Sequence, residues 1–254
     1  MKSMKLWLVP AIAVLCISGV QAAETETASV IRDYTDTVAP AEQQAYEAGI
    51  KSYNQCLSQH GFKYAWTAWV HETGNVYEYS YVSDPGTWGS FDDMQTVGQA
   101  CDQTFRTNVN PHLLSETSAF YVDMPELSYM PKTMTGTPAL IGVRYFKFKP
   151  GHQDEFVNAA RKINAAFKKA GGDNFHMIGQ VMYGGSGAAD MILVLPRNNW
   201  ADLGAELGQP WKLLASVYGK KMAVALHKQI IDSIEDTSVH VDRYNAALSY
   251  APPK

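Results

Sequence analysis

The same pattern of residues occurs twice in this chain of 254 residues, at a constant offset of 110 positions. The segment PAEQQAYEAGIKSYNQCLSQHG (residues 40–61) aligns without a gap on PGHQDEFVNAARKINAAFKKAG (residues 150–171). Identical residues are few, but apolar residues recur at spacings of 4, 3 and 4 in both copies, which is typical of one buried stripe on a helix. Each segment begins at a proline and ends at a glycine, as helices commonly do. The stripe residues are Tyr46, Ile50, Tyr53 and Leu57 in the first copy and Phe156, Ala160, Ile163 and Phe167 in the second.

Strands on both sides of each predicted helix complete a βαββαβ unit. After each glycine come two segments with alternating apolar residues, separated by a turn, which is typical of a β-hairpin. A second helical region follows, reaching from about residue 210 to 235 in the second copy, and then a closing strand, TSAFYVD or TSVHVD. The strand before the helix is clear in the second copy (ALIGVRYFKFKP) and weaker in the first (SVIRDYTDTVAP). This order predicts two ferredoxin-like repeats in an α+β fold, each an antiparallel sheet with both helices on one face.

The domain boundaries follow from the Leu-Ser-Tyr triplet that ends each unit, at residues 127–129 and 248–250. We expect ferredoxin-like repeat 1 at residues 23–130, a linker at 131–138 (PKTMTGTP) and ferredoxin-like repeat 2 at 139–254. A sheet with helices on one face leaves its other face in need of cover. Two small units in one chain are therefore expected to cover each other.

The first 22 residues have the features of a signal peptide. Lys2 and Lys5 precede an apolar run from Leu6 to Val20, and Val20-Gln21-Ala22 is a small-x-small cleavage pattern. The alternative is a membrane anchor, but 15 apolar residues fall short of the roughly 20 that span a bilayer. We therefore expect an exported chain, periplasmic or secreted, with no membrane attachment after cleavage.

Charge and cysteine content restrict the partners and the compartment. Removing two lysines and no acids changes the net charge from −4 to −6, and no run of Lys or Arg is present to neutralise phosphates, so nucleic acid is not an expected partner. Residues 23–254 keep two cysteines, Cys56 and Cys101. In an oxidising compartment they are candidates for a disulfide, and two buried free thiols are the alternative.

One segment resembles a known superfamily. RYFKFKPGHQDEFVNAARK (residues 144–162) is similar to the opening strand, Pro-Gly turn and first helix of the dimeric α+β barrel superfamily, which includes NIPSNAP-like and antibiotic-biosynthesis-monooxygenase-like domains. The resemblance implies that the two repeats pack sheet to sheet as one intramolecular barrel. Members of this superfamily include cofactor-free oxygenases, isomerases and haem enzymes, so the resemblance does not fix the chemistry.

Alternation along the strands divides side chains between the helix side and the barrel interior, and we assign the more apolar face to the helix side. In the second repeat this places Ile141, Val143, Tyr145, Met177 and Val181 under the helices. The interior candidates are then polar or aromatic, which suits a small ligand with a flat body and a polar anchor. These ligand-binding candidates are Tyr34, Tyr64, Trp66, Tyr121, Arg144, His176, Gln180, His240 and Asp242. The alternative is an interior filled by side chains.

The candidate chemistry is limited. His176 and His240 are weak candidates for acid–base catalysis, because an imidazole titrates near neutral pH. His240 and Asp242 share a strand face, yet no HxxxH, HExxH or CxxC pattern accompanies them, so no metal is predicted. Haem would have to use His227, in the last helical region, and no CxxCH motif is present, so no cofactor is predicted.

The leading hypothesis is an exported protein that binds a small molecule between its two sheets. The first alternative is an enzyme with cofactor-free monooxygenase-like or isomerase-like activity in the same cavity. The second is a structural or interaction module with a filled core, whose sheet edges pair with another copy in a homodimer or with another partner.

Overall fold

A computed structural model describes residues 29–130, 136–171, 175–205 and 209–253, without the side chains of Ala205 and Gln209. The predicted signal peptide, residues 1–22, and most of the predicted linker, residues 131–138, lie outside these ranges. No described helix is long and apolar enough to cross a membrane.

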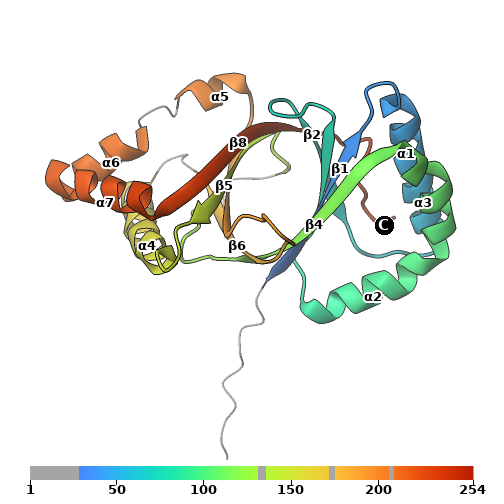
Figure 1. Cartoon of the computed structure of the whole chain (residues 1–254), viewed down its shortest axis with the longest axis horizontal. Helices are drawn as coiled ribbons and strands as arrows, with labels where there is room; N and C mark the ends of the chain where they lie inside the picture. The colour runs from blue at the N-terminus through green and yellow to red at the C-terminus, as the bar shows by residue number, and fades with distance from the viewer. Residues whose placement is uncertain (1–28, 131–135, 172–174, 206–208, 254) are drawn as a thin grey trace, which may run out of the picture.

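Eight antiparallel strands close into one barrel at the centre of the molecule (Figure 1). Around the barrel the order is β1-β3-β2-β8-β5-β7-β6-β4, and β4 pairs with β1. The strands are β1 (Val30–Val38), β2 (Trp66–His71), β3 (Glu78–Ser83), β4 (Leu113–Asp123), β5 (Leu140–Phe148), β6 (Met177–Tyr183), β7 (Met191–Arg197) and β8 (Ile234–Tyr244). The predicted strand segments are present in both copies, and a closed barrel leaves none of these strands with a free edge.

Both halves of the chain contribute the same arrangement of strands. In the first half the order is β4-β1-β3-β2, and in the second it is β8-β5-β7-β6, so the fourth strand lies beside the first and the second is at the far edge. Two pairings between the halves close the barrel, β2 with β8 and β4 with β6. We call these the β2–β8 seam and the β4–β6 seam.

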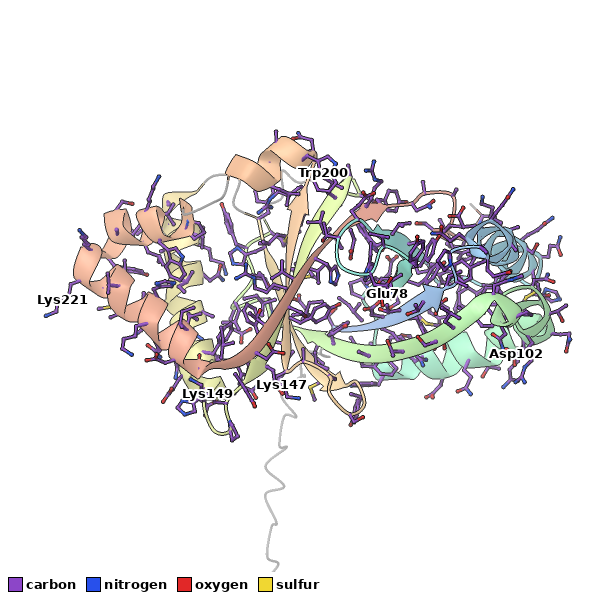
Figure 2. The ribbon with its side chains drawn as sticks, turned by 45° about the horizontal axis from the view of Figure 1, so that its top comes forward. Glu78, Asp102, Lys147, Lys149, Trp200 and Lys221 are labelled. Atoms are coloured by element: carbon purple, nitrogen blue, oxygen red, sulfur yellow. A yellow bond between two sulfur atoms is a disulfide. The ribbon has the colours of Figure 1, made fainter. Side chains whose placement is uncertain are left out.

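The helices form two layers on opposite sides of the barrel, marked in Figure 2 by Lys221 on one layer and Asp102 on the other. The first layer contains α1 (Gln43–Gln59), α2 (Trp88–Gly98) and α3 (Asp102–Asn108), with short 3-10 helices η1 (Gln99–Cys101) and η2 (Asn110–His112). The second contains α4 (Gln153–Ala170), α6 (Gln209–Tyr218) and α7 (Lys220–Ser233), and α5 (Trp200–Ala205) follows β7. The last helical region, predicted as one segment, is interrupted at Gly219, whose φ of 82° is readily adopted only by glycine.

The predicted stripes on α1 and α4 are confirmed. Tyr46, Ile50 and Leu57 are buried on α1, and the corresponding residues of α4 are buried as well, namely Phe156, Ala160 and Phe167. Each stripe packs on the outer face of its own half of the barrel. The spacing of apolar residues was sufficient to identify these faces, because one side of each helix is exposed to solvent and the sheet covers the other.

The second Leu-Ser-Tyr segment packs on the first half. Leu248 is fully buried in the core beneath α1. The Ser249 hydroxyl accepts a hydrogen bond from the backbone N–H of Ala68 at 2.8 Å. Tyr250 exchanges two backbone hydrogen bonds with Trp66, each 3.0 Å long. The end of the chain thus extends the β2–β8 seam.

The first Leu-Ser-Tyr segment packs in the same way on the second half. Leu127 is fully buried in the core beneath α4. The Ser128 hydroxyl accepts a hydrogen bond from the backbone N–H of Ile178 at 2.9 Å, and Tyr129 exchanges two backbone hydrogen bonds with His176. Each half is therefore completed by the tail of the other.

One asparagine on each first helix holds the neighbouring tail. Asn54 donates from Nδ2 to the carbonyls of Leu248 and Ser249 at 3.0 and 3.3 Å. Asn164, 110 positions later, donates to the carbonyls of Glu126 and Ser128 at 2.8 and 3.0 Å. The sequence offset therefore relates two asparagines that both bind backbone carbonyls of the neighbouring tail.

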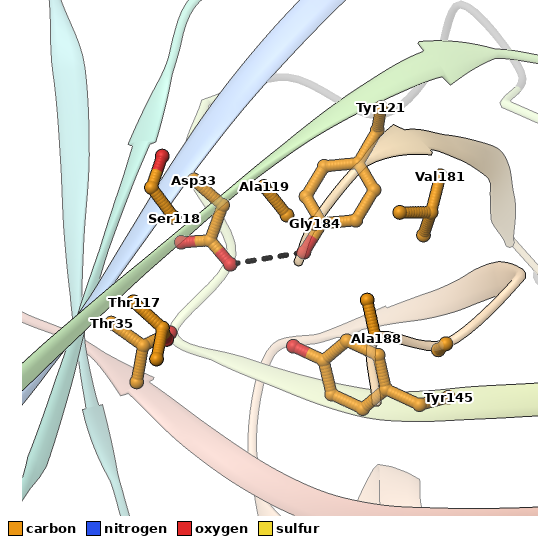
Figure 3. A pocket seen from close by; sticks show the side chains of 11 residues that line it. Asp33, Thr35, Thr117, Ser118, Ala119, Tyr121, Tyr145, Val181, Gly184 and Ala188 are labelled. Carbon is orange, nitrogen blue, oxygen red and sulfur yellow. Dashed lines mark hydrogen bonds between the residues drawn. The ribbon is translucent and has the colours of Figure 1, made fainter. Parts of the chain in front are cut away.

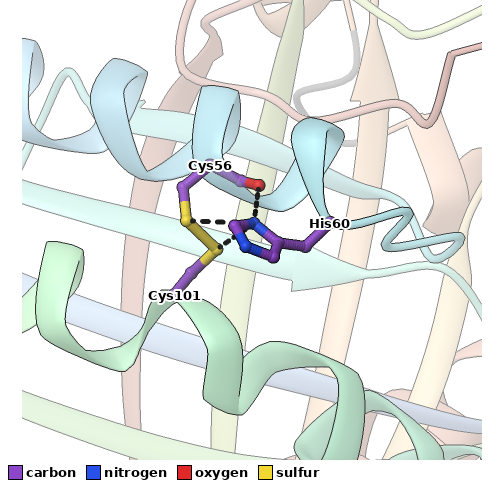
Figure 4. The surroundings of a disulfide bond; sticks show 3 residues. All are labelled: Cys56, His60 and Cys101. Atoms are coloured by element: carbon purple, nitrogen blue, oxygen red, sulfur yellow. Dashed lines mark hydrogen bonds between the residues drawn. A yellow bond between two sulfur atoms is a disulfide. The ribbon is translucent and has the colours of Figure 1, made fainter.

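A disulfide joins Cys56 on α1 to Cys101 beside α3 (Figure 4). The ring of His60 lies next to it, with Nδ1 3.6 Å from one sulfur and 3.7 Å from the other. The bond closes a sequence separation of 45 residues and fixes the helical layer of the first half.

The buried tail leucines lead to a stability prediction. Leu127→Ala and Leu248→Ala should each lower the free energy of unfolding by about 2–5 kcal/mol, because each removes a fully buried side chain and leaves a cavity. Urea denaturation followed by circular dichroism measures the loss. The control is Leu114→Ala, because Leu114 is 67% exposed and should change little. A loss below 1 kcal/mol for both tail variants would contradict this account of the tails.

Candidate functional site

Two histidines and an aspartate meet inside the barrel at the β2–β8 seam. His71 on β2 is directly opposite Asp242 on β8, and His240 precedes Asp242 by two residues on the same face. His240 Nε2 lies 3.2 Å from Asp242 Oδ2, and His71 Nε2 lies 3.8 Å from Asp242 Oδ1. The two imidazole rings stack with centroids 4.4 Å apart. The closure of the barrel brings these three residues together, because β2 and β8 belong to different halves.

Polar residues of β1 and β3 surround His71. Its Nδ1 lies 3.2 Å from Glu78 Oε2, and its Nε2 lies 3.1 Å from the Ser80 hydroxyl. The Ser80 hydroxyl is in turn 3.1 Å from the hydroxyl of Thr35. His71 is therefore fixed by contacts to both ring nitrogens.

A cavity of about 180 Å³ lies farther along the interior, toward the β4–β6 seam (Figure 3). Asp33 of β1, Tyr121 of β4 and Tyr145 of β5 supply its acidic and phenolic groups. The Tyr121 hydroxyl donates to Asp33 Oδ2 at 3.2 Å, whereas Asp33 Oδ1 has no hydrogen-bond partner among the described residues. The Tyr145 ring lies 5.5 Å from the ring of His240, which connects the cavity to the seam.

Burial controls the ionisation of the cavity groups. It raises the pKa of Asp33 from an ordinary 3.8 to about 7, an effect that the Tyr121 hydrogen bond opposes and the charge of Asp242 reinforces. Burial and the nearby charge of Asp33 also raise the pKa values of Tyr121 and Tyr145 well above their usual range. Desolvation lowers the pKa of His71, which favours a neutral imidazole. Near neutral pH the cavity therefore offers neutral phenols and a carboxyl group that can gain or lose a proton.

Three of the four polar residues at these contacts, Asp33, His71 and His240, correspond to apolar residues of the other half. Asp33 pairs with Ala119 across β1 and β4, while the matching pair across β5 and β8 is Val143 with His240. His71 faces Asp242 at one seam, and Val181 faces Tyr121 at the other. Packing alone does not require Asp33, His71 or His240, because the related positions hold Val143, Val181 and Ala119, whereas the position related to Asp242 holds Tyr121. Their burial costs free energy unless they are paired, which marks them as candidates for function.

Three of the nine predicted ligand-binding residues lie inside the barrel. Tyr121 belongs to the interior cluster, and His240 and Asp242 lie at the β2–β8 seam. The prediction missed Asp33, His71, Ser80 and Tyr145. Strand alternation predicts which residues share a strand face with Asp33 and with His71. It does not predict whether that face points into the barrel, so these two residues could not be identified as interior residues from the sequence.

The predictions for the first half that placed Tyr34, Tyr64 and Trp66 inside are wrong. The Arg32 guanidinium lies 4.3 Å above the Tyr34 ring on the helix side of β1. Tyr64 donates a hydrogen bond to Asp93 of α2, and Trp66 packs in the helix-side cluster that contains Tyr250.

The predictions that placed Arg144, His176 and Gln180 inside are also wrong. Arg144 is exposed. The His176 ring packs 5.1 Å from Phe167 of α4, and its Nε2 donates to the Leu127 carbonyl. Gln180 is opposite Met191, which belongs to the core beneath α4.

These errors have one cause, which is that apolar residues of the second half were assigned to the helix side. Five of them line the barrel interior instead, namely Ile141, Val143, Tyr145, Met177 and Val181. The assignment assumed that the more apolar face is covered by helices. In a closed barrel the interior is buried as well, so the more apolar face need not be the one under the helices.

His227 is not placed to bind a haem. It is exposed on α7, and its ring packs against Trp211 of α6 with centroids 4.1 Å apart. An axial haem ligand has to face an enclosed pocket, and this histidine faces solvent. We therefore assign no step to haem.

No family model and no curated protein matches this chain. Solved structures do share its fold. A Lactobacillus acidophilus NCFM protein provisionally assigned as a monooxygenase matches with a TM-score of 0.54 at 8% identity, over 88% of this chain and 96% of its own. An anthrone oxidase-like protein matches with a TM-score of 0.58 at 12% identity, over 90% of this chain and 95% of its own.

A mutant chlorite dismutase from Candidatus Nitrospira defluvii is similar as well. Its TM-score is 0.56 at 10% identity, over 88% of this chain and 93% of its own. These likenesses show the fold alone, because the identities are low. The chain shares the closed α+β barrel fold of these monooxygenase-like, anthrone oxidase-like and chlorite dismutase proteins.

The raised pKa of Asp33 predicts a pH dependence of stability. The folded chain keeps the Asp33 proton to a higher pH than the unfolded chain does, so this group lowers the free energy of unfolding as pH rises from about 4 to about 7. Asp33→Asn removes this effect and should make the protein more stable than the parent at pH 8, by on the order of 2–4 kcal/mol, but not at pH 4. The titratable groups that face position 33 are the same in the parent and in Asp33→Asn, namely Tyr121, Tyr145, His240 and Asp242.

Urea denaturation at a series of pH values measures this difference. Asp154→Asn, on the exposed surface of α4, is the control and should leave the profile unchanged. Parallel pH profiles for the parent and Asp33→Asn would contradict the prediction.

Proposed function

We propose that the barrel binds a small organic molecule in the cavity beside Asp33 and that Asp33 exchanges a proton with it. The observation that supports this most directly is a buried carboxyl group on the wall of a cavity, with one oxygen that accepts no hydrogen bond from the described residues. A polar ligand would supply the missing partner.

The surroundings of Asp33 suit formation of an enolate or phenolate. Asp33 accepts the proton of an acidic C–H or O–H group, and the hydroxyl of Tyr145, on the same cavity, donates a hydrogen bond to the oxygen that becomes negative. A carboxyl group with a pKa of about 7 can act as base and as acid near neutral pH. The cavity of about 180 Å³ has room for a small molecule.

Two of the sequence-based alternatives share this proton transfer. In an isomerase-like enzyme, the proton returns to a different atom of the substrate anion. In a cofactor-free monooxygenase-like enzyme, the substrate anion reacts with molecular oxygen. The names of two structural neighbours, a provisional monooxygenase and an anthrone oxidase-like protein, support an enzyme of this kind. The interaction-module alternative has less support, because the barrel contains a cavity and leaves none of the described strands with an unpaired edge.

Hydrogen exchange tests the proposed proton transfer. The protein is incubated in D₂O with a panel of small enolisable ketones and phenols, and deuterium uptake at carbon is followed by NMR. Asp33→Asn should slow enzyme-dependent exchange about 10²-fold or more. The control is Asp36→Asn, since Asp36 is also buried with a pKa of about 7 but binds Tyr46 on the helix side of β1. Equal rates for the parent and Asp33→Asn on every exchanged compound would exclude Asp33 as the base.

We also propose that the chain is a tandem repeat of one ferredoxin-like unit and belongs to the dimeric α+β barrel superfamily, which includes NIPSNAP-like and antibiotic-biosynthesis-monooxygenase-like domains. The common strand order of the halves and the reciprocal Leu-Ser-Tyr contacts support this proposal. Similar losses of stability in Leu127→Ala and Leu248→Ala are expected of a duplicated unit, and a loss confined to one of them would argue against it.

Export to the periplasm or the medium is a third proposal. It rests on the sequence of residues 1–22, and the Cys56–Cys101 disulfide supports it because such bonds persist in oxidising compartments.

Intact-mass measurement tests export. After expression of the full chain in a bacterial host, the periplasmic or secreted protein should begin at Ala23 and should be lighter than its reduced form by two hydrogens. Recovery of the chain only in the cytoplasm, still beginning at Met1, would contradict the proposal.

A further inference from the structure

The cluster of His71, His240 and Asp242 at the β2–β8 seam has the composition of a metal site. One ligand atom from each residue lies within 4.8 Å of the other two. Two ligands about 2.1 Å from a tetrahedral ion are roughly 3.4 Å apart. The separations of 3.2 Å from Asp242 to His240 and 3.8 Å from Asp242 to His71 are close to this value.

The backbone fixes the positions of all three residues. His71 and Asp242 are direct cross-strand partners, and His240 lies on the same face of β8 two residues earlier. Side chains held on paired strands define a site more accurately than side chains on loops. The imidazole planes are 20° apart, so the two rings must turn toward one another to share an ion.

Asp242 provides a second, independent observation. Its side chain is only 2% exposed, and its Oδ1 has no hydrogen-bond partner among the described residues. At the other seam Val181 stands in the place of His71, so the barrel does not need an imidazole there. A buried carboxylate beside two imidazoles, with one oxygen that accepts no hydrogen bond, is an arrangement that a cation would stabilise.

Glu78 occupies the place of a supporting residue around a metal. Its Oε2 lies 3.2 Å from His71 Nδ1, and an ionised carboxylate can only accept a hydrogen bond. His71 Nδ1 therefore donates, and the lone pair lies on Nε2, the nitrogen nearest Asp242, where it accepts from the Ser80 hydroxyl that an ion would replace. A carboxylate that orients a ligating histidine in this way is common in zinc proteins.

We propose that His71, His240 and Asp242 bind a divalent first-row transition metal ion such as Zn²⁺, through Nε2 of each histidine and the carboxylate of the aspartate. Imidazole and carboxylate ligands suit this class of ion, and three protein ligands leave a coordination position open. The sequence did not suggest this site, because His240 and Asp242 lacked a third ligand until the barrel brought His71 beside them. The proposal is independent of the role proposed for Asp33.

A second group of metal-binding residue types, Cys56, His60 and Cys101, is a suitable control. Its two sulfurs are joined in a disulfide and are not available as thiolates. The substitution His60→Gln therefore tests whether any bound metal belongs to this other cluster.

Zn²⁺ titration of the chain, purified without a histidine tag and treated with a chelator, tests the proposal. Competition with a chromophoric chelator measures affinity, and elemental mass spectrometry measures stoichiometry. We expect one Zn²⁺ per chain. His240→Gln and Asp242→Asn should each weaken binding at least about 100-fold, and Glu78→Gln should weaken it about 10–100-fold. His60→Gln should bind as the parent does.

Co²⁺ provides a readout that a purely structural effect would not alter. Bound Co²⁺ should give a visible absorption spectrum that changes in His240→Gln, even where that variant keeps the parent circular dichroism. No binding of Zn²⁺ or Co²⁺ by the folded parent would overturn the proposal. Undiminished binding by folded His240→Gln and Asp242→Asn would overturn it as well, and loss of binding in His60→Gln alone would assign the ion to the other cluster.

Discussion

Strand pairing between the two halves is the interaction on which the rest of the structure depends. Each four-stranded sheet has one face under its helices and one face that would meet water if the halves were separate. The β2–β8 and β4–β6 seams remove both pairs of free edges and bury the second face of each sheet. The two Leu-Ser-Tyr tails lengthen these contacts, because each places its leucine in the core of the opposite half and its serine hydroxyl on a strand N–H. The halves are therefore parts of one folding unit.

Once the barrel is closed, departures from its internal symmetry become informative. A barrel built from two similar units could be filled by apolar side chains throughout, and at several related positions it is. Asp33 and His71 stand where the other half has Val143 and Val181. Buried acids and imidazoles weaken a core unless they are paired, so their presence in one half only suggests that a function retained them. The cavity beside Asp33 and the cluster at the β2–β8 seam are the two places where that function can be sought.

The two places are close enough to influence each other. Tyr145 lines the cavity, and its ring lies 5.5 Å from the ring of His240. The charge of Asp242 contributes to the raised pKa of Asp33. A positive ion at the seam would oppose that contribution, since a nearby positive charge favours the ionised carboxylate. Proton exchange in the cavity and metal binding at the seam are thus physically linked, even though each is tested by its own substitutions.

The sequence by itself determined the duplicated order of helices and strands. Its offset of 110 paired Asn54 with Asn164 and one apolar stripe with the other. Each helix has a solvent-exposed face and a buried face, which the periodicity of apolar residues can distinguish. Only the tertiary structure decided which face of each strand points into the barrel. The barrel interior is buried as well as the face under the helices, so hydrophobic alternation gave the period but not its phase, and Trp66, Arg144 and His176 were assigned to the wrong side. The meeting of His71 with His240 and Asp242 also required the fold, because residues some 170 positions apart become neighbours only when β2 pairs with β8.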